Sequence, residues 1–436
     1  MVLIYSETTP ARLQYIARLL LEDLFGLETE FTNDFGHYLS FNGPKVNYSD
    51  MQSDQGLRIH PVSLLFEKSV FDIQVPVGKH QGMTLLYPDG NSDMPFDLFA
   101  ASFYLVSRYE EYVSSGKDRY GRFLYKNSIA GIHGFCGEPV VNLWARMLID
   151  RLKEKWPGLV LNQPPFRYVS TIDVDHAFAY KGRTAWRVLG GFLRSLRKGA
   201  FGEFRDRLRV LTGLSDDPFD TFDYIQTFHT KLGIEPHFFI LFADYHGHDN
   251  NVTLSNMEFR KIIAGLADKC CVGIHPSLSS NRKPQKLETE IAGLSLATGR
   301  VITSSRQHFL KFSFPKTYRH LITNGITDDF SIGYATETGF RAGIASPFLF
   351  FDLYRNAVTN LVIHPVTFMD VTLKDYHRLT PAKSIETVKQ LTNLVRSVNG
   401  EMVSLWHNES LCDAGAWKGW KRVFEETTAY AAGKQE

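Results

Sequence analysis

Acidic and imidazole side chains stand at the ends of most strand-like segments in the second half of the chain. The first such segment ends in Asp173-Val-Asp175, and side chains two residues apart in a strand share a face, so both carboxylates can point into one cavity. Carboxylate oxygens and imidazole nitrogens are ligands that zinc accepts, with a position left open for water. One carboxylate can bind the ion while the other acts as a base. The polar residues at the other segments are His275, Arg306, His308, Asp328, Asp329, His364 and His407.

This set of groups suits the hydrolysis of a carbonyl compound. In such a reaction the ion polarises the carbonyl group, a carboxylate takes a proton from water, and a histidine protonates the leaving group. A single Asp at a strand end often only caps the next helix, so a loop that caps a helix at Ala177 is the alternative for Asp173 and Asp175. Ordinary hydrogen-bonded roles are the alternatives for the histidines.

The elements that must position these residues follow a regular alternation from Phe166 onward. Short β-branched or aromatic runs alternate with longer amphipathic helical stretches, which predicts an α/β fold with a parallel sheet or barrel. Because the carboxyl ends of barrel strands meet at one rim, the polar residues should converge there. The strand candidates are 166–173, 236–242, 271–275, 301–305, 328–333, 359–364 and 401–406.

The chain divides near residue 162. The segment Asn162-Gln-Pro-Pro165 reads as a linker, because consecutive prolines continue neither a helix nor a central strand. Helical patterns and short strand-and-turn pieces before it predict that residues 1–162 form a small α+β domain, and no catalytic motif is visible there. Residues 163–436 then form the second domain.

Composition restricts the class of protein. Of 436 residues, 44% are apolar, and 48 Lys plus Arg against 47 Asp plus Glu give a net charge of +1, which offers no global attraction for nucleic acid. The beginning of the chain shows no signal sequence, and no stretch is long and apolar enough to span a membrane. We therefore expect a cytoplasmic protein with reduced thiols, since its four cysteines are too irregularly placed for a disulfide framework.

Four short motifs resemble the polysaccharide deacetylase family, the carbohydrate esterases with a nodulation-protein-type deacetylase domain. Thr171-Ile-Asp173-Val-Asp175 is similar to the family's first motif, and Gly273-Ile-His275-Pro-Ser277 to the start of its second. Ser305-Arg306 resembles the third motif, and Leu405-Trp406-His407 matches the closing motif. The resemblance covers roughly residues 166–430 and implies a distorted seven-stranded (β/α) barrel. The first 162 residues look like the extra N-terminal domain of some bacterial members.

The resemblance also implies roles. Asp173 would be the catalytic base, and His407 would be the general acid. Asp175 and His275 would bind a divalent metal ion, which we expect to be zinc. Arg306 would orient and tune the base at the substrate site. His364 is a rival for the acid, although it lies one strand too early.

One departure concerns the metal ligands. The second motif of the family has another histidine four residues after the first, and here that position is Ser279, a poor zinc ligand. We expect His308 to replace it, because His308 lies two residues past Arg306 and so shares its face at the same rim. His176 and Ser277 are weaker candidates. Without a replacement, the site would bind metal loosely or not at all.

Two further residues are candidates for substrate binding. Trp406 could form an apolar wall on which a sugar ring stacks. Arg341, in Gly339-Phe-Arg-Ala-Gly343, suits a clamp on substrate or carboxylate, although a structural ion pair explains it equally well.

Residues 183–209 form a basic and amphipathic segment. It holds eight Arg or Lys residues against Glu203 and Asp206, a local excess of +6, interleaved with Trp, Leu, Val and Phe. Such a segment could lie on a membrane surface or an anionic glycan, which would make the protein peripheral at the membrane. The alternative that we favour from sequence is a helical lid packed over the barrel mouth with a solvated basic face.

Together these observations predict a metal-dependent hydrolase that removes N-acetyl or O-acetyl groups from a polysaccharide or glycan precursor. Its partner is a carbohydrate substrate and not a nucleic acid. The alternative is a catalytically inactive deacetylase-like barrel that binds a glycan or a protein partner.

Overall fold

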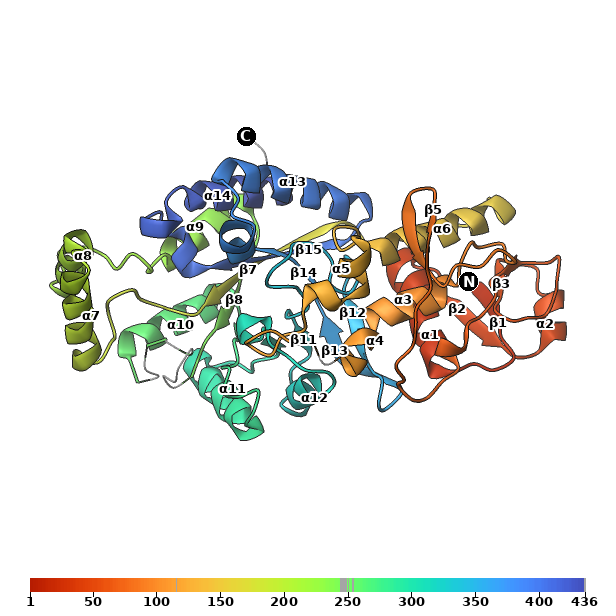
Figure 1. The fold of residues 1–436 in the computed structure, drawn as a ribbon, viewed down its shortest axis with the longest axis horizontal. Helices are drawn as coiled ribbons and strands as arrows, with labels where there is room; N and C mark the ends of the chain where they lie inside the picture. The colour runs from red at the N-terminus through yellow and green to blue at the C-terminus, as the bar shows by residue number, and fades with distance from the viewer. Residues whose placement is uncertain (115, 244–248, 250, 253–254, 435–436) are drawn as a thin grey trace.

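The computed structural model describes residues 1–114, 116–243, 249, 251–252 and 255–434. Its elements form three blocks along the longest axis of the molecule: a small sheet with the N-terminus, a larger curled sheet in the middle, and a helical hairpin at the far end (Figure 1). The α/β class expected from the sequence is confirmed.

The N-terminal block is built on a parallel four-stranded sheet in the order β2-β1-β3-β4. Its central strand, β1 (Val2–Tyr5), is buried along its whole length, as is typical of an apolar run in a parallel sheet covered on both faces. The other elements of this block are α1 (Ala11–Arg18), β2 (Thr29–Thr32), α2 (Phe35–Ser40), β3 (Lys45–Asn47), β4 (Leu57–Arg58), the hairpin β5 (Val77–His80) and β6 (Met83–Leu86), α3 (Leu98–Val106), α4 (Tyr109–Val113), α5 (Ile129–His133) and α6 (Val140–Lys155).

The middle block is a nine-stranded sheet in the order β12-β13-β11-β10-β9-β8-β7-β15-β14. All neighbouring strands pair in parallel except β12 and β13. The strands are β7 (Arg167–Val174), β8 (His237–Ile240), β9 (Cys271–Ile274), β10 (Ser304–Ser305), β11 (Asp328–Asp329), β12 (Phe348–Asp352), β13 (Ala357–Ile363), β14 (Val366–Met369) and β15 (Glu401–His407). The helices of this half are α7 (Ala185–Arg197), α8 (Phe201–Leu211), α9 (Phe222–Leu232), α10 (Met257–Lys269), α11 (Pro284–Thr298), α12 (Lys316–Thr323), α13 (Pro381–Ser397) and α14 (Trp420–Ala431).

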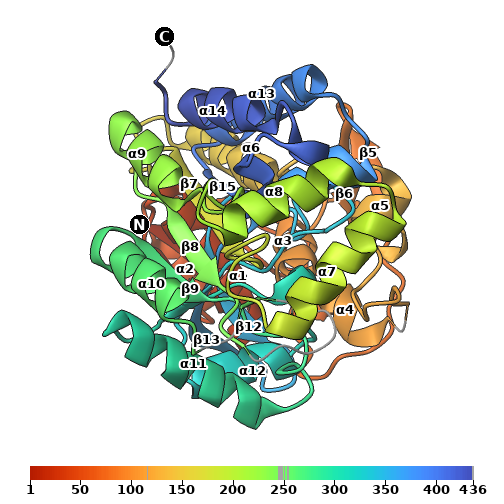
Figure 2. The ribbon, with the colours of Figure 1, turned by 90° about the vertical axis from the view of Figure 1, so that its left-hand side faces the viewer.

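The sheet curls because of the way its two edges are connected. Strands β13 and β14 lie near opposite ends of the strand order, yet only two residues, His364 and Pro365, separate them in the chain. The backbone N–H of Val366 also donates to the carbonyl of Ile332, just beyond β11, over 2.7 Å. The two edges therefore approach each other, and helices such as α9, α10, α11 and α14 surround the curled sheet (Figure 2).

The strand count differs from the seven expected. Each predicted segment contains one observed strand, but β12 and β14 were missed. The sequence pattern assigns a single strand around residues 359–364, because Pro365 looks like its end and β14 is only four residues long. β12 is the antiparallel partner of β13, an arrangement that an alternating β/α pattern does not signal.

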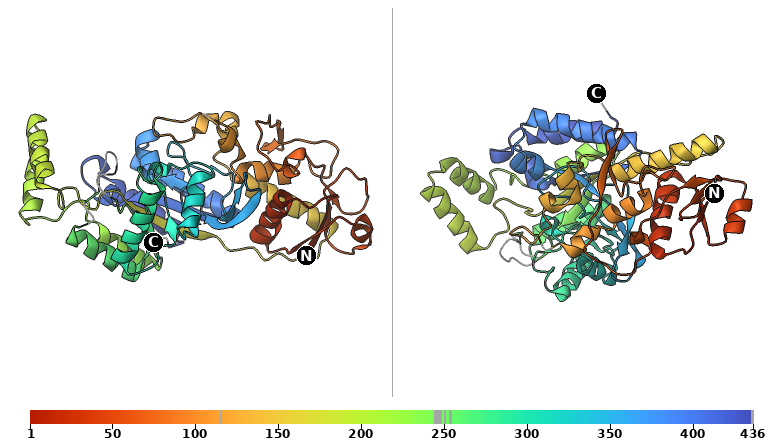
Figure 3. Two further views of the ribbon diagram at one scale, coloured as in Figure 1. Left: turned by 90° about the horizontal axis from the view of Figure 1, so that it is seen from below. Right: turned by 45° about the vertical axis from the view of Figure 1, so that its right-hand side comes forward.

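The N-terminal block packs on the β12–β13 edge of the large sheet. The Tyr15 hydroxyl donates to the carbonyl of Leu349 over 2.6 Å, and the Arg12 side chain donates to the Asn356 side chain over 2.9 Å. One hydrophobic core runs through both blocks, and the edge strand is covered as a result. The domain boundary at residue 162 stays a prediction. Figure 3 shows this block at the opposite end of the molecule from the hairpin of α7 and α8.

The segment after β7 does not pack as a lid. Its helices α7 and α8 stand away from the curled sheet, and apolar side chains such as Trp186 remain exposed to solvent (Figures 1 and 2). The expected packing of this apolar face over the barrel mouth is therefore wrong. Among the described residues, no helix combines the length and the apolar character that a membrane crossing requires.

Candidate metal-dependent active site

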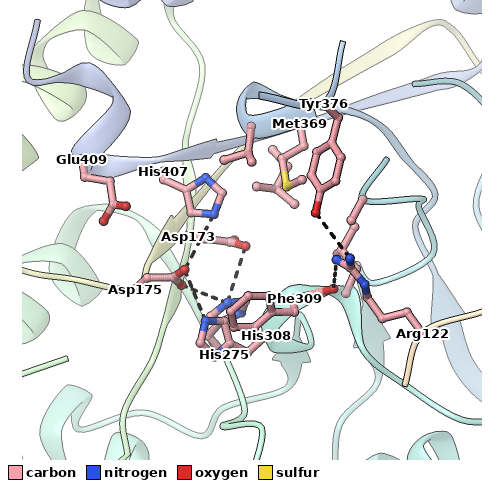
Figure 4. Close-up of a pocket in the computed structure, with 14 residues that line it drawn as sticks. Arg122, Asp173, Asp175, His275, His308, Phe309, Met369, Tyr376, His407 and Glu409 are labelled. Carbon is pink, nitrogen blue, oxygen red and sulfur yellow. Dashed lines mark hydrogen bonds and ion pairs between the residues drawn. The ribbon is translucent and has the colours of Figure 1, made fainter. Parts of the chain in front are cut away.

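The carboxylates of the first motif lie where β7 ends. Asp173 is the penultimate residue of β7 and Asp175 follows the strand directly. Both line a cavity of about 160 Å³, which Figure 4 shows in close-up. In the neighbouring strand β15, the last residue, His407, stands opposite Asp173 in the register and lines the same cavity. Two adjacent parallel strands thus deliver two carboxylates and an imidazole to one place.

Two more imidazoles reach this cavity from β9 and β10. His275 follows β9, and its backbone N–H continues the sheet by donating to the carbonyl of Ile240 over 2.9 Å. His308 lies three residues beyond β10, at the start of a short 3₁₀ turn. Both line the cavity. The predicted convergence of Asp173, Asp175, His275, His308 and His407 is therefore present in the structure.

Asp175, His275 and His308 lie close enough to share one ion. Oδ1 of Asp175 is 3.1 Å from Nε2 of His275, and Oδ2 is 3.3 Å from Nε2 of His308. One ligand atom from each of the three residues lies within 4.8 Å of the other two. An oxygen and two nitrogens that face one another at this separation fit a divalent cation with open positions for water and substrate.

The Nδ1 atoms of His275 and His308 contact groups outside the three-residue cluster. Nδ1 of His275 donates to the carbonyl of Arg306 over 2.6 Å, and Nδ1 of His308 lies 3.0 Å from the Asp249 carboxylate. These contacts at Nδ1 orient both rings so that their Nε2 atoms face Asp175. Metal-binding histidines are commonly oriented in this way by a carbonyl or carboxylate behind the ring. Sequence reasoning missed Asp249, which lies in a polar segment after β8 that carries none of the motifs.

The charges of the cluster depend on one another. Burial alone would raise the pKa of Asp175, but the charge of His308 and hydrogen bonds from His275 and His308 hold it well below its usual range. Burial lowers the pKa of His308, yet Asp175 and Asp249 outweigh it and raise that pKa to about 9. The carboxylates of Asp175 and Asp249 thus favour a positive charge beside the His308 ring, which a proton or a divalent cation would supply.

The other candidate ligands lie elsewhere. The Ser279 hydroxyl is 2.9 Å from the Ser277 hydroxyl and accepts from Lys286 over 2.8 Å. The His176 ring pairs with Glu409 at 2.9 Å. Neither Ser279, Ser277 nor His176 lies in the cluster of three, so His308 alone of the proposed replacements joins Asp175 and His275.

Asp173 is buried beside a positive charge. Oδ1 of Asp173 is 3.4 Å from the Arg306 guanidinium, and Oδ2 is 3.7 Å from Nε2 of His275. Arg306 has no exposed surface, donates from Nε to the carbonyl of Phe330 over 2.9 Å and lies over the Phe239 ring at 4.8 Å. Arg306 does not line the cavity, so its expected place at the substrate site is not a direct contact with that cavity; its guanidinium instead pairs with the Asp173 carboxylate.

His407 is held by a carboxylate that the sequence did not reveal. Oδ1 of Asp370 lies 2.8 Å from Nδ1 of His407, and Oδ2 accepts the backbone N–H of His407 over 2.9 Å. Burial would lower the pKa of His407, but the charge and hydrogen bond of Asp370 raise it well above its ordinary value. This shift favours the protonated ring, whose Nε2 lies 3.8 Å from Oδ2 of Asp175. Asp370 follows β14, the strand that the sequence pattern missed.

We predict that Asp370→Asn slows the cleavage of substrates with an amine leaving group more than the cleavage of 4-nitrophenyl acetate. With the acid role that the resemblance implies for His407, release of an amine would need a proton from its ring, so we expect kcat for an N-acetylated sugar to fall by about 10²-fold. Cleavage of 4-nitrophenyl acetate needs no such proton and should change less than about tenfold. The measurement is kcat on both substrates, with Asp375→Asn, an exposed aspartate five residues away, as the matched control. Equal losses on both substrates would contradict the role given to His407.

Three other predicted residues lie outside this cavity, namely Trp406, His364 and Arg341. Trp406 is fully buried between Phe368 and Phe424, because alternate residues of β15 point to opposite sides of the sheet and Trp406 faces α14. It offers no surface to a sugar. His364 bonds to Glu401 at 2.6 Å and to Asp328 at 3.1 Å and lines a different cavity, so it does not rival His407.

Arg341 forms a buried ion pair with the N-terminal block instead of a substrate clamp. Its guanidinium donates to both carboxylate oxygens of Glu111, over 2.9 and 2.6 Å, and to the carbonyl of Gly333 over 2.9 Å. Glu111 also accepts from Arg108 over 2.9 Å, and all three side chains are almost fully buried. The structural alternative for Arg341 therefore applies.

Glu111→Ala should destabilise the protein strongly, because it leaves two buried guanidinium groups without their shared carboxylate. We expect the free energy of unfolding to fall by about 3–5 kcal/mol. Glu154→Ala, which removes an exposed partner of Arg151, should change it by less than about 1 kcal/mol. Urea unfolding of both variants provides the measurement, and similar losses would argue against a structural role for the pair.

Several groups of the cavity wall were not found from sequence. Arg122 reaches the cavity from the N-terminal block and donates to the carbonyl of Phe309 over 3.3 Å and to the Tyr376 hydroxyl over 3.4 Å (Figure 4). Met369 lies near Tyr376, and Glu409 lines the opposite side of the cavity. The first 162 residues carry no motif, yet they supply one side of the site.

Comparison with known proteins gave a family match for the first part of the chain and several similar solved structures. Residues 2–157 match a model described as "Family of unknown function (DUF7033)". No curated protein matched the sequence. A "putative polysaccharide deacetylase from Mycobacterium smegmatis" is similar with a TM-score of 0.40 and 15% identity, covering 62% of this chain and 84% of that one.

Two further solved structures are similar to this chain. "Puue Allantoinase" gives a TM-score of 0.38 and 10% identity, covering 61% of this chain and 85% of the other. A mutant of BA3943, described as a CE4 family pseudoenzyme with restored enzymatic activity, gives a TM-score of 0.26 and 12% identity, covering 61% and 63%. The functional argument below rests on the geometry of the site itself.

Proposed function

We propose that this protein is a metal-dependent hydrolase that removes N-acetyl or O-acetyl groups from a polysaccharide or glycan precursor. The observation that carries the proposal is the meeting of a buried carboxylate, a three-residue ligand cluster and a carboxylate-held histidine at one cavity. These are the groups that water activation, carbonyl polarisation and leaving-group protonation require.

Each residue has a distinct task in this proposal. Asp175, His275 and His308 would hold a divalent ion, and zinc suits their oxygen and nitrogen donors. When bound, that ion would polarise the acetyl carbonyl and lower the pKa of water. Asp173 takes the proton of the attacking water, with its carboxylate fixed by Arg306. His407 gives its Nε2 proton to the departing amine or alcohol and is kept protonated and oriented by Asp370.

The wall of the cavity supports a sugar as the rest of the substrate. Phe309 and Tyr376 supply aromatic surface, and Arg122 supplies hydrogen-bond donors beside them. Rings of this kind pack on the apolar face of a sugar, while charged donors meet its hydroxyl groups. This wall takes the place of Trp406 as the proposed contact for carbohydrate.

Metal content together with acetate release tests the proposal. We expect the purified protein to bind about one zinc ion per chain. It should release acetate from N-acetylhexosamine oligosaccharides, lose that activity with a chelator and regain it when zinc is returned. The absence of both bound metal and acetate release, with glycan binding intact, would favour the alternative of a catalytically inactive binding module.

A further inference from the structure

The hairpin of α7 and α8 has an inner side that holds its two helices together. The Phe192 and Phe204 rings meet edge to face at 4.9 Å between their centroids. Gly191 lies against the Arg207 guanidinium, where a Cβ atom on residue 191 would clash. Arg207 also lies over the Phe192 ring at 5.7 Å and donates to Glu203 over 3.0 Å. These contacts show that α7 and α8 pack on each other.

The outer side of the hairpin is apolar and exposed. In α7 the exposed apolar residues recur at helical spacing, and Trp186 is 83% exposed. In α8 they recur in the same way, and Phe201 is 70% exposed. The exposed apolar residues of the two helices are Trp186, Leu189, Leu193, Leu196, Phe201, Leu208 and Leu211. A stripe of this size exposed on a protruding element marks an interaction surface.

The two stripes lie on the same side of the hairpin. At 100° per residue, the stripe of α7 lies between the side that carries Phe192 and the side that carries Arg194. The stripe of α8 lies in the same rotational order between Arg207, which packs on α7, and Arg209. Because the chain reverses direction between the helices, this shared order places both stripes on one face, with arginines along the outer flanks.

The opposite side of the hairpin is basic and faces a groove. This groove, of about 1330 Å³, runs between the hairpin and the end of the barrel that carries the site cavity. Its acidic lining residues are Glu203, Asp206 and Asp216, and its basic ones are Arg183, Arg187, Arg194, Lys198, Arg207 and Arg209. His176 also lines the groove, while its ion-pair partner Glu409 lines the site cavity, so the two spaces adjoin.

We infer that the hairpin docks the protein on a bilayer that contains anionic lipids. The apolar face enters the boundary between headgroups and acyl chains, and Arg197 and Arg205, which are exposed beside the stripes of α7 and α8, bind the lipid phosphates. A second copy of this chain would explain the apolar face but would bring together two segments that each carry a charge excess of +6 over residues 183–209. An acidic glycan would explain the basic residues but leave the apolar stripe in water.

Docking in this orientation leaves the groove and the adjoining site cavity on the side of the hairpin that faces away from the bilayer. The docking does not rest on the proposed function, because it is measured without substrate.

Flotation with lipid vesicles tests the inference. We expect the full chain to bind vesicles of phosphatidylcholine that contain phosphatidylglycerol more tightly than vesicles of phosphatidylcholine alone, and to be released near 1 M salt, where the Debye length is about 3 Å. Arg197→Glu with Arg205→Glu should lower the partition coefficient by at least about 30-fold. The matched control is Lys153→Glu with Lys261→Glu, two exposed lysines on α6 and α10.

The apolar contribution has its own variants. Trp186→Ser with Leu193→Ser should lower binding by at least about tenfold, whereas Val160→Ser with Leu296→Ser, two apolar residues exposed elsewhere, should leave it unchanged. Tryptophan emission should shift to the blue when vesicles are added, and Trp186→Phe should remove that shift while the other five tryptophans remain. This readout reports insertion directly.

Three results would overturn the inference. They are absence of binding to anionic vesicles, equal binding by the hairpin variants and the wild type, and a concentration-dependent dimer that only the hairpin variants disrupt. Loss of acetate release with vesicle binding intact would contradict the proposed function and leave the docking surface in place. Vesicle binding variants should retain acetate release from soluble oligosaccharides, which separates the two proposals.

Discussion

Asp173→Asn is expected to lower kcat for acetate release by about 10²–10⁴-fold while leaving the metal content unchanged. Asp173 is the carboxylate that Arg306 fixes at 3.4 Å and that lies outside the three-residue ligand cluster. An amide in its place keeps the shape but cannot take a proton from water. Acetate release and metal analysis on the same preparation provide the measurement.

Asp175→Asn is the matched comparison, since it changes the neighbouring carboxylate on the same face. We expect it to lose the metal and the activity together, because Asp175 faces both His275 and His308. Retained metal in Asp173→Asn shows that its site is still folded despite the unpaired Arg306. A variant of Asp173 with full kcat would place the base elsewhere.

His308→Ala is expected to weaken zinc binding as much as His275→Ala does, by more than about 10²-fold. Loss of a group behind a ligand typically weakens metal binding by about 10–100-fold, so loss of a ligand should exceed that range. Competition with a chromogenic chelator measures both affinities. Acetate release should fall in parallel with zinc occupancy.

His176→Ala serves as the control for this variant. His176 directly follows Asp175 in the chain, but its ring pairs with Glu409 and takes no part in the cluster. We expect its zinc affinity to stay within about threefold of the wild type. If His308→Ala bound zinc as the wild type does, His308 would not be a ligand. No residue would then replace the histidine that the resembled family has at the position of Ser279.

The convergence of the site could be predicted because its residues stand at strand ends. A parallel sheet brings such positions to one edge, so Asp173, Asp175, His275 and His407 could be placed from pattern alone. His308 followed from its spacing to Arg306. The roles of these residues remain predictions, whereas their common position is a finding of the structure.

The residues that the sequence did not reveal act through contacts distant in the chain. Asp370 supports His407 across 37 residues, and its strand begins just after a proline that looks like a strand end. Asp249 supports His308 across 59 residues. Arg122 comes from the other block altogether. No periodic pattern marks such partners.

Other predictions were wrong because the sequence pattern does not show where a side chain points or what it contacts. Trp406 has the right type for a sugar platform, but it lies one residue before His407 in a strand and so faces the opposite side of the sheet. Arg341 has the right type for a clamp, but a buried glutamate from the N-terminal block already binds it. The apolar residues of α7 and α8 look like the face of a packed lid, and the hairpin instead leaves them exposed.

A crystal structure of the protein grown with zinc tests the central claim most directly. We predict one ion bound by a carboxylate oxygen of Asp175 and by Nε2 of His275 and His308, each at about 2.0–2.2 Å. Asp173 and His407 should face that ion without binding it. An ion held by other residues, or a site in which His308 points away while zinc is bound, would contradict the account.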